Sequence, residues 1–191
     1  MTTIETLYDR HVDAIFRYIV RRVGRIAEAE DLTSQTFYKA LRSLWRFDEK
    51  NEQAWLYRIA TNEVNDYFRR RRSAESALEA QPTQRAEQAA AEAELARHEL
   101  YTRLHQALSD LAVDDQALIA LRYFEQLPFA EIATILDTKK GTLVMRSHRA
   151  LKKLKARLHE RGIDHDEVRA FLDGPGAAGS EAPRLQAHAA P

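Results

Sequence analysis

The sequence predicts an all-α protein with two small helical domains, a flexible linker between them and a C-terminal extension. Two observations carry this prediction. Apolar residues recur at three- and four-residue spacing in two separate parts of the chain, which is the period of amphipathic helices. Between these parts the period fades into Ser, Ala, Gln and Glu around Pro82, as expected of a linker. The predicted boundaries are 1–72, 73–96, 97–161 and 162–191.

The first domain is expected to hold three amphipathic helices, at about 3–23, at about 27–44 and from Gln53 onward. Thr2 and Glu5 stand in the positions of a capping box at the start of the first helix. Short connections allow three such helices to close around one hydrophobic core.

The second domain is expected to hold helices near 97–110, 114–125, 129–136 and 139–159. The stretch 86–99 is rich in Ala and Glu, so it could also be helical and merge with the first of them. The last two form a candidate helix-turn-helix, in which the small Ala133 allows the helices to approach closely. Asp137 occupies the turn between them and tolerates the left-handed backbone conformation better than most residues. Beyond residue 162 we expect a short helix and then a disordered tail rich in Ala, Gly and Pro.

The composition excludes several classes of protein. The chain has no cysteine, which excludes a disulfide framework, and its seven histidines show no metal-ligand spacing, so we predict no metal and no cofactor. No apolar run approaches the ~20 residues of a membrane span, and we expect a soluble, cytoplasmic protein. Without a Gly-rich phosphate loop or a grouped set of Ser, His and Asp, we expect neither an enzyme nor a small-molecule substrate.

The charges are strongly segregated, although the net charge of the 191 residues is zero. Residues 138–161 contain nine Lys or Arg and one Glu, a net charge of +8. The tail from residue 162 carries two basic and five acidic residues, a net charge of −3. A dense basic block on a helix is typical of an element that binds phosphates.

Two separated groups of motifs give the most specific signal. The first group comprises residues 31–37 (DLTSQTF) and 55–62 (WLYRIATN), and the second comprises residues 131–133 (EIA), Gly141-Thr142 and Arg146. They resemble the region 2 and region 4 motifs of extracytoplasmic-function (ECF) sigma factors of the sigma-70 family. The order and spacing fit that family over most of residues 1–161.

The resemblance implies a protein that binds core RNA polymerase, through the clamp of the largest subunit and the flap region. It would direct promoter recognition and transcription initiation, and an anti-sigma factor would control it. By the same resemblance, the residues that bind core polymerase are Asp31, Leu32, Ser34 and Gln35.

The resemblance also assigns two sets of DNA-binding residues. Those at the minus-ten element are Trp55, Arg58, Asn62, Asn65 and Arg69. Unpaired bases need stacking surfaces, amides and nearby cations, and this segment offers all three. At the minus-thirty-five element, bases would be read by Val144, Met145, His148 and Arg149, and phosphates held by Lys139, Lys140, Thr142 and Lys152. Arg149 is suited to a guanine edge, since arginine donates two hydrogen bonds to it.

Several of these residues have a plausible structural role instead. Leu32 could pack in the hydrophobic core, and for Trp55 we favour such packing over stacking on a base. We expect Arg146 to form an ion pair with Glu131. Ser147 stands where the family has a buried aliphatic residue, and its hydroxyl could bond the Leu143 carbonyl within the same helix.

Departures from the family pattern limit what can be transferred. Ser34 and Gln35 replace the usual Gln-Glu pair, and Lys139 and Met145 replace serines, so base preference cannot be copied from relatives. Two rival functions remain open. One is a helix-turn-helix regulator that acts on duplex operator DNA without core polymerase, against which the N-terminal motifs argue. The other is an interaction protein that sequesters a polymerase subunit or regulator without reading DNA, against which the basic block argues.

Overall fold

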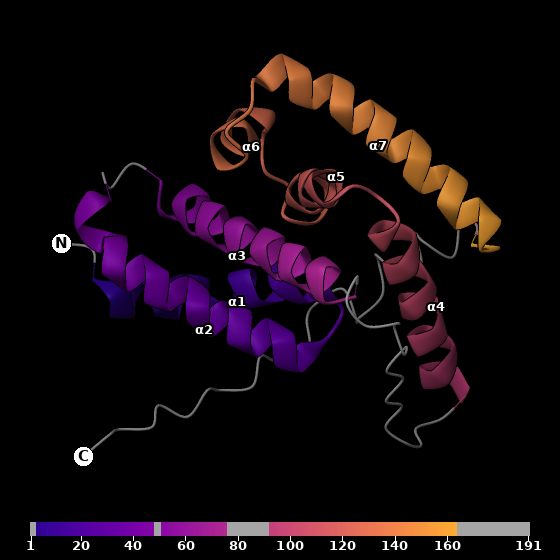
Figure 1. Ribbon diagram of the computed structural model, residues 1–191, viewed down its shortest axis with the longest axis horizontal. Coiled ribbons are helices and arrows are strands. Elements are labelled where there is room, and N and C mark those ends of the chain that lie inside the picture. The colour runs from indigo at the N-terminus through magenta and orange to yellow at the C-terminus, as the bar shows by residue number, and fades with distance from the viewer. Residues whose placement is uncertain (1–2, 48–50, 76–91, 164–191) are drawn as a thin grey trace.

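A computed structural model describes residues 3–47, 51–75 and 92–163, with only the backbone given at 74–75 and 92–98. In these ranges every regular element is helical (Figure 1), as the sequence predicts. The elements are α1 (Ile4–Val23), α2 (Ile26–Ser43), the 3₁₀ turn η1 (Leu44–Arg46), α3 (Glu52–Glu75), α4 (Glu92–Ser109), α5 (Val113–Ile119), the π-helical turn η2 (Ala120–Phe124), α6 (Phe129–Ile135) and α7 (Lys140–Glu160).

The described helices extend into the predicted linker from both sides. Helix α3 continues to Glu75, beyond the predicted domain end at 72, and α4 begins at Glu92 rather than near 97. Most of the predicted linker, residues 76–91, lies outside the described residues. The predicted helix and tail beyond 163 lie outside them as well.

The first helix begins one residue later than the predicted capping box. Thr3, not Thr2, is the N-cap: its hydroxyl accepts the amide of Thr6 at 3.3 Å, and the Thr6 hydroxyl accepts the amide of Thr3 at 3.1 Å. A threonine hydroxyl therefore takes the place that Glu5 was expected to fill. Gly24 ends the helix at φ +74°, a left-handed conformation that favours glycine.

Helices α1, α2 and α3 form the N-terminal module, with a hydrophobic core between them. Leu7, Ile19, Leu56 and Val64 are completely buried there. The Tyr18 hydroxyl is also buried, and it lies 2.8 Å from the Thr61 hydroxyl, so the polar group is satisfied inside the core. The predicted three-helix packing is therefore confirmed.

The C-terminal module contains the expected helix-turn-helix in α6 and α7. Asp137 lies in the turn at φ +47°, which confirms the left-handed position predicted for it. Leu143, Ser147 and Ala150 form the buried face of α7. The hydroxyl of Ser147 lies 3.2 Å from that of Tyr123 in η2, so its partner is on another element and not the Leu143 carbonyl.

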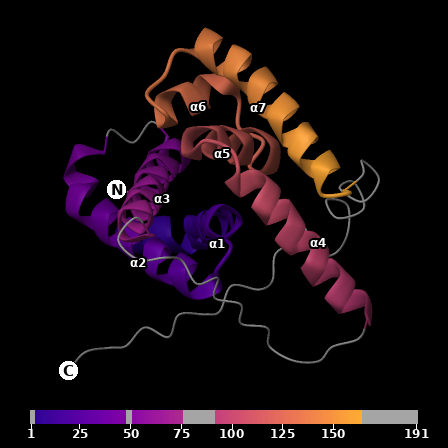
Figure 2. The same ribbon diagram turned by 45° about the vertical axis from the view of Figure 1, so that its right-hand side comes forward.

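The two modules pack against each other and share one hydrophobic core. Helix α3 contacts α5 and α6, while α1 contacts η2. Figures 1 and 2 both place α5 between α3 and α7. Leu118, Leu121 and Ile132 of the second module join the core of the first. The link between the predicted domains is therefore a packed interface as well as a chain connection.

A buried carboxylate ties the modules together. Glu125, which follows η2, accepts hydrogen bonds from Arg21 of α1 and from the Tyr57 hydroxyl of α3, each at 2.6 Å. Burial and the nearby carboxylate raise the pKa of the Tyr57 hydroxyl, which therefore stays protonated and donates. Arg22 adds a bond to the main-chain carbonyl of Val113 at 3.1 Å. This polar cluster fixes how α1 and α3 meet the second module.

Helix α4 docks on the end of α1 through an imidazole ring. A Cβ atom added at Gly24 would lie 2.4 Å from Nε2 of His105, so a larger residue here would displace the ring. Burial lowers the pKa of His105, which favours a neutral ring at this contact. Gly24 thus ends α1 in a left-handed conformation and also lets His105 of α4 pack closely against it.

The Gly24→Ala variant should lower the free energy of unfolding by about 1–2 kcal/mol, because alanine resists the left-handed conformation, and should also displace His105. Gly162→Ala is a matched control, since Gly162 has φ +64° but open space around its Cβ position. Urea unfolding followed by circular dichroism measures both losses. Equal losses for the two variants would show that the close approach of His105 contributes nothing.

Candidate nucleic-acid interfaces

One side of α7 is exposed and carries half of the residues predicted to meet duplex DNA. Met145 and Lys152 each lie three or four residues from His148 and Arg149, so the four share one face of the helix, and all four are exposed. This face lies opposite the buried face of α7. Val144 is half-buried at its edge. The structure therefore brings together most of the predicted base-reading side chains.

The first turn of α7 adds further polar groups. Lys139 is the N-cap, and Lys140 and Thr142 follow it, all exposed. The N-terminal end of a helix carries partial positive charge and free amide groups, which favour phosphate oxygens. The residues predicted to hold phosphates therefore lie beside the exposed face, except for Lys152, which lies within it.

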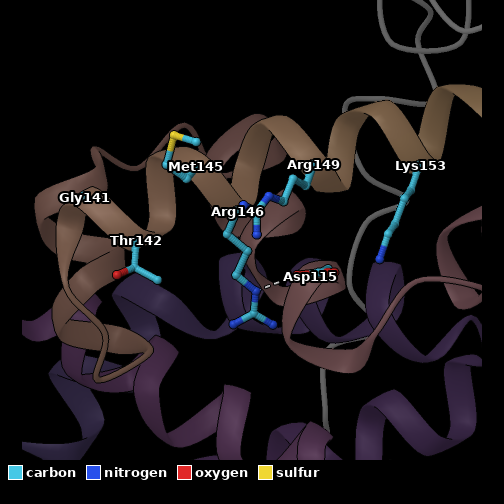
Figure 3. A pocket seen from close by; sticks show the side chains of 7 residues that line it. All are labelled: Asp115, Gly141, Thr142, Met145, Arg146, Arg149 and Lys153. Carbon is cyan, nitrogen blue, oxygen red and sulfur yellow. Dashed lines mark hydrogen bonds and ion pairs between the residues drawn. The ribbon is translucent and has the colours of Figure 1, made fainter.

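A groove of about 640 Å³ runs between α5 and α7 (Figure 3). It is lined by Asp115, Gly141, Thr142, Met145, Arg146, Arg149 and Lys153. In Figure 3, Arg146 reaches toward Asp115, whereas Met145 points away from it. The groove borders the exposed face of α7, so a bound duplex would meet both.

The predicted ion pair between Arg146 and Glu131 is wrong. Arg146 donates to Asp115 at 2.6 Å and lies 3.4 Å from Asp114, both in the first turn of α5. Helix α5 packs directly against α7, which puts its acidic first turn within reach. Arg146 therefore fixes α7 relative to α5, while Arg149 and Lys153 supply the positive charge of the groove.

A second groove, of about 910 Å³, lies between the end of α2 with η1 and helix α3. It is lined by Lys39, Arg42, Ser43, Trp45, Arg46, Ile59, Asn62, Glu63, Asn65, Asp66 and Arg69. Three of the predicted minus-ten residues, Asn62, Asn65 and Arg69, lie together in it. Asn65 also accepts a hydrogen bond from Arg22 at 3.2 Å, and Arg69 pairs with Asp66 at 2.9 Å.

The other two predicted minus-ten residues do not line this groove. Trp55 is half-buried and stacks on Phe47, with ring centroids 4.8 Å apart, so it supports the core as favoured from the sequence. Arg58 is exposed one helical turn before Asn62, on the same face of α3. It extends the polar stripe of α3 beyond the end of the groove.

Sequence reasoning missed the contribution of α2 and η1 to this groove. Lys39, Arg42, Trp45 and Arg46 all line it, and the Trp45 side chain is 75% exposed. A signal was present, because an aromatic residue between Arg42 and Arg46 is the composition of a single-strand binding surface.

On α2, the residues predicted to bind core polymerase divide into exposed and buried ones. Asp31, Ser34 and Gln35 are exposed, as a protein-binding surface requires. Leu32 is only 2% exposed and belongs to the hydrophobic core, so it is not part of that surface. The exposed apolar side chains farther along the helix are Tyr38 and Leu41.

Neither a metal-binding cluster nor a membrane-spanning helix occurs among the described residues. No group of three or more His, Cys, Asp or Glu side chains in the described ranges is placed to hold a metal ion. No described helix combines the length and the apolar character needed to cross a membrane.

Comparisons with known proteins match both modules. The family model "Sigma-70 region 2" matches residues 7–74, and "Sigma-70, region 4" matches residues 101–154. The RNA polymerase sigma factor YlaC of Bacillus subtilis is 32% identical over 172 residues, covering 83% of this chain and 96% of YlaC. The ECF sigma factor BldN of Streptomyces coelicolor is 34% identical over 155 residues, covering 78% of this chain. The chain spans only 57% of the length of BldN, and 61% of that of SigE of Mycolicibacterium smegmatis.

Two solved structures share the fold. The sigma factor RpoE of Bartonella quintana, in complex with the anti-sigma factor NepR, has a TM-score of 0.62 and 22% identity, and the match covers 81% of this chain and 96% of RpoE. CnrH in complex with the cytosolic domain of CnrY has a TM-score of 0.63 and 23% identity, covering 82% of this chain and 88% of CnrH. At this level of identity the likeness concerns the arrangement of the helices.

Proposed function

Because this chain belongs to the ECF group of the sigma-70 family, we propose that it is an alternative sigma factor that binds core RNA polymerase and directs promoter recognition and transcription initiation. The observation that supports this proposal is the presence, in one chain, of two different surfaces whose chemistry suits nucleic acid. One is the exposed basic face of α7, and the other is the groove between α2 with η1 and α3.

The α7 face suits the upstream duplex element. A helix fits the major groove of B-DNA, where each base pair presents a distinct pattern of donors and acceptors. Arg149 can donate two hydrogen bonds to a guanine, and Met145 can contact a thymine methyl group. Lys139, Lys140, Thr142 and Lys152 would then hold the flanking phosphates and set the position of the helix.

The groove beside α3 suits the downstream element in its unpaired form. It combines the amides of Asn62 and Asn65 with several cations, which is what recognition of a flipped or unpaired base needs. Strand separation can draw on this binding energy. The proposed role therefore needs no catalytic site in this chain, and it places the protein with the polymerase in the cytoplasm.

Two protein partners belong to this proposal. Core polymerase would bind the exposed polar residues of α2, namely Asp31, Ser34 and Gln35. An anti-sigma factor is the second partner, in line with the complexes in which RpoE and CnrH were solved. The rival function, a regulator acting without core polymerase, would leave both the α2 surface and the groove beside α3 without a role.

The Asp31→Arg variant should weaken binding to core polymerase about fivefold or more, because it reverses a charge at the rim of the proposed interface. The fold should persist, since Asp31 is exposed. Asp13→Arg is the control, because Asp13 is an exposed aspartate on α1. Core affinity is measured by titration with a fluorescently labelled chain. Equal affinity of both variants and the unmodified protein would remove Asp31 from the interface.

The Asn62→Ala variant should reduce promoter opening about fivefold, since a lost hydrogen bond costs about 1 kcal/mol. Permanganate footprinting of unpaired thymines by the holoenzyme measures the opening, while upstream duplex protection should persist. Gln106→Ala is the control, because Gln106 carries an exposed amide on α4. Unchanged opening with Asn62→Ala would exclude its amide from base recognition.

A further inference from the structure

Trp45 is held in a fixed orientation on the protein surface. Its Nε1 donates to the main-chain carbonyl of Arg42 at 3.2 Å, and the guanidinium of Arg46 lies 4.4 Å from the ring centroid. These two contacts orient the indole, yet 75% of the side chain stays exposed. An oriented aromatic surface loses little conformational entropy when a flat ligand stacks on it.

The two tryptophans of the chain have different environments. Trp55 is half-buried against Phe47 and packs on the hydrophobic core, so its burial accounts for its presence. Trp45, by contrast, has the largest exposed fraction among the exposed large apolar side chains of the described residues, so burial does not account for its presence. Tryptophan is enriched at binding interfaces relative to the rest of a protein surface, so an exposed one at the edge of a groove is a candidate contact residue.

The chemistry around Trp45 identifies the class of ligand. Two carboxylates line the groove with it, but each is paired: Glu63 with Lys39, and Asp66 with Arg69. Within the described residues, Arg42 and Arg46 make no ion pair, and each guanidinium lies over an aromatic ring. The groove therefore offers positive charge that no described carboxylate neutralises, beside a flat aromatic surface, and this combination matches a strand of unpaired nucleotides.

We propose that Trp45 is a stacking platform for one unpaired base of the non-template strand, adjacent to the base that meets Asn62. The base covers the open surface of the indole, while the Arg46 guanidinium stays over the ring and contributes positive charge near the phosphates. This inference rests on the proposed function, because it adds a residue to the minus-ten surface of a sigma factor.

A contact with polymerase is the main alternative, since Tyr38, Leu41 and Trp45 follow each other at helical spacing along α2 and η1. The residues that line the groove distinguish a base contact from a polymerase contact. Trp45 lines it together with Asn62, whereas Tyr38 and Leu41 do not. Stacking on a base is therefore the role that the position of Trp45 favours.

The test uses the holoenzyme assembled from core polymerase and the full chain. The probe is a fork-junction DNA taken from a fragment that the holoenzyme selects from a random-sequence pool, with 2-aminopurine at each position of the unpaired non-template tail in turn. Stacking on an aromatic ring quenches 2-aminopurine fluorescence. We expect quenching at one tail position that is lost in Trp45→Ala and retained in Trp45→Phe. Affinity for the fork should fall about tenfold in Trp45→Ala.

Tyr38→Ala serves as the matched control, because Tyr38 is an exposed aromatic residue on α2 outside the groove. It should leave both the quenching and the fork affinity unchanged. Unchanged quenching and fork affinity in Trp45→Ala would overturn the stacking role while leaving the sigma-factor proposal intact. Weaker binding to core polymerase with unchanged quenching would overturn it in favour of a polymerase contact. Failure of the unmodified holoenzyme to select any fragment would instead contradict the proposed function itself.

Discussion

Replacing Glu125 by alanine is expected to lower the free energy of unfolding by about 3 kcal/mol, the largest loss predicted for a single polar side chain of this protein. Its carboxylate is 9% exposed and accepts two hydrogen bonds of 2.6 Å, from Arg21 and from Tyr57. Removal leaves a half-buried guanidinium and a buried phenol without their acceptor, and breaking a buried pair from one side costs about 3–5 kcal/mol. We take the lower end because Arg21 remains 25% exposed.

Urea unfolding of three variants tests this expectation. Glu125→Gln should lose less, since the amide oxygen can still accept one of the two hydrogen bonds. Glu131→Ala is the matched control, because Glu131 is a partly exposed glutamate on α6. Glu125→Ala should also uncouple the unfolding of the two modules. Two spectroscopic probes, one for each module, would then report transitions that no longer coincide. A loss no greater than that of the Glu131→Ala control would show that Glu125 does not hold the modules together.

Replacing Arg149 by alanine is expected to weaken binding to a specific upstream element by about 1–3 kcal/mol, because a bidentate contact with a guanine edge is lost. Its guanidinium is exposed on the same face of α7 as Met145 and His148. The preference at one base pair should relax, while affinity for scrambled duplexes should change little.

Lys152→Ala provides the contrast, since Lys152 lies on the same face but is expected to meet phosphate. Its loss should weaken binding to all sequences alike and reduce the dependence on salt. Competition between specific and scrambled duplexes for the holoenzyme, repeated at several salt concentrations, measures both the sequence preference and the salt dependence. Equal losses on the two DNAs for Arg149→Ala would reassign it to the phosphate backbone.

Helical periodicity alone was enough to place most elements of this fold. The last helix, predicted at 139–159, is observed at Lys140–Glu160, and the turn before it has Asp137 in the expected left-handed conformation. These features are local. The spacing of apolar residues within a helix indicates its buried face, and the residue type at a turn position indicates whether a left-handed conformation is tolerated there. The basic face of α7 could be predicted for the same reason.

Contacts between distant segments could not be predicted in this way. Arg146 takes Asp115 rather than Glu131 because α5 packs on α7, and Glu125 bonds to Arg21, 104 positions away. The π-helical turn η2, which precedes Glu125, leaves no mark on the apolar period. Leu32 illustrates a different difficulty. On a helix that also binds a partner, an apolar residue is compatible with either the buried face or the exposed face. The structure shows that Leu32 lies on the buried face.

We propose that this chain directs transcription only together with core polymerase, a claim that in vitro transcription of a genomic fragment library tests. Reactions contain core enzyme alone, this protein alone, or both, and the 5′ ends of the transcripts are mapped. We predict that only the complete reaction gives transcripts from a defined set of fragments, whose start sites share two upstream elements. No added transcripts in the complete reaction, together with tight duplex binding by the protein in the absence of core enzyme, would contradict the claim and identify the protein as a regulator of another kind.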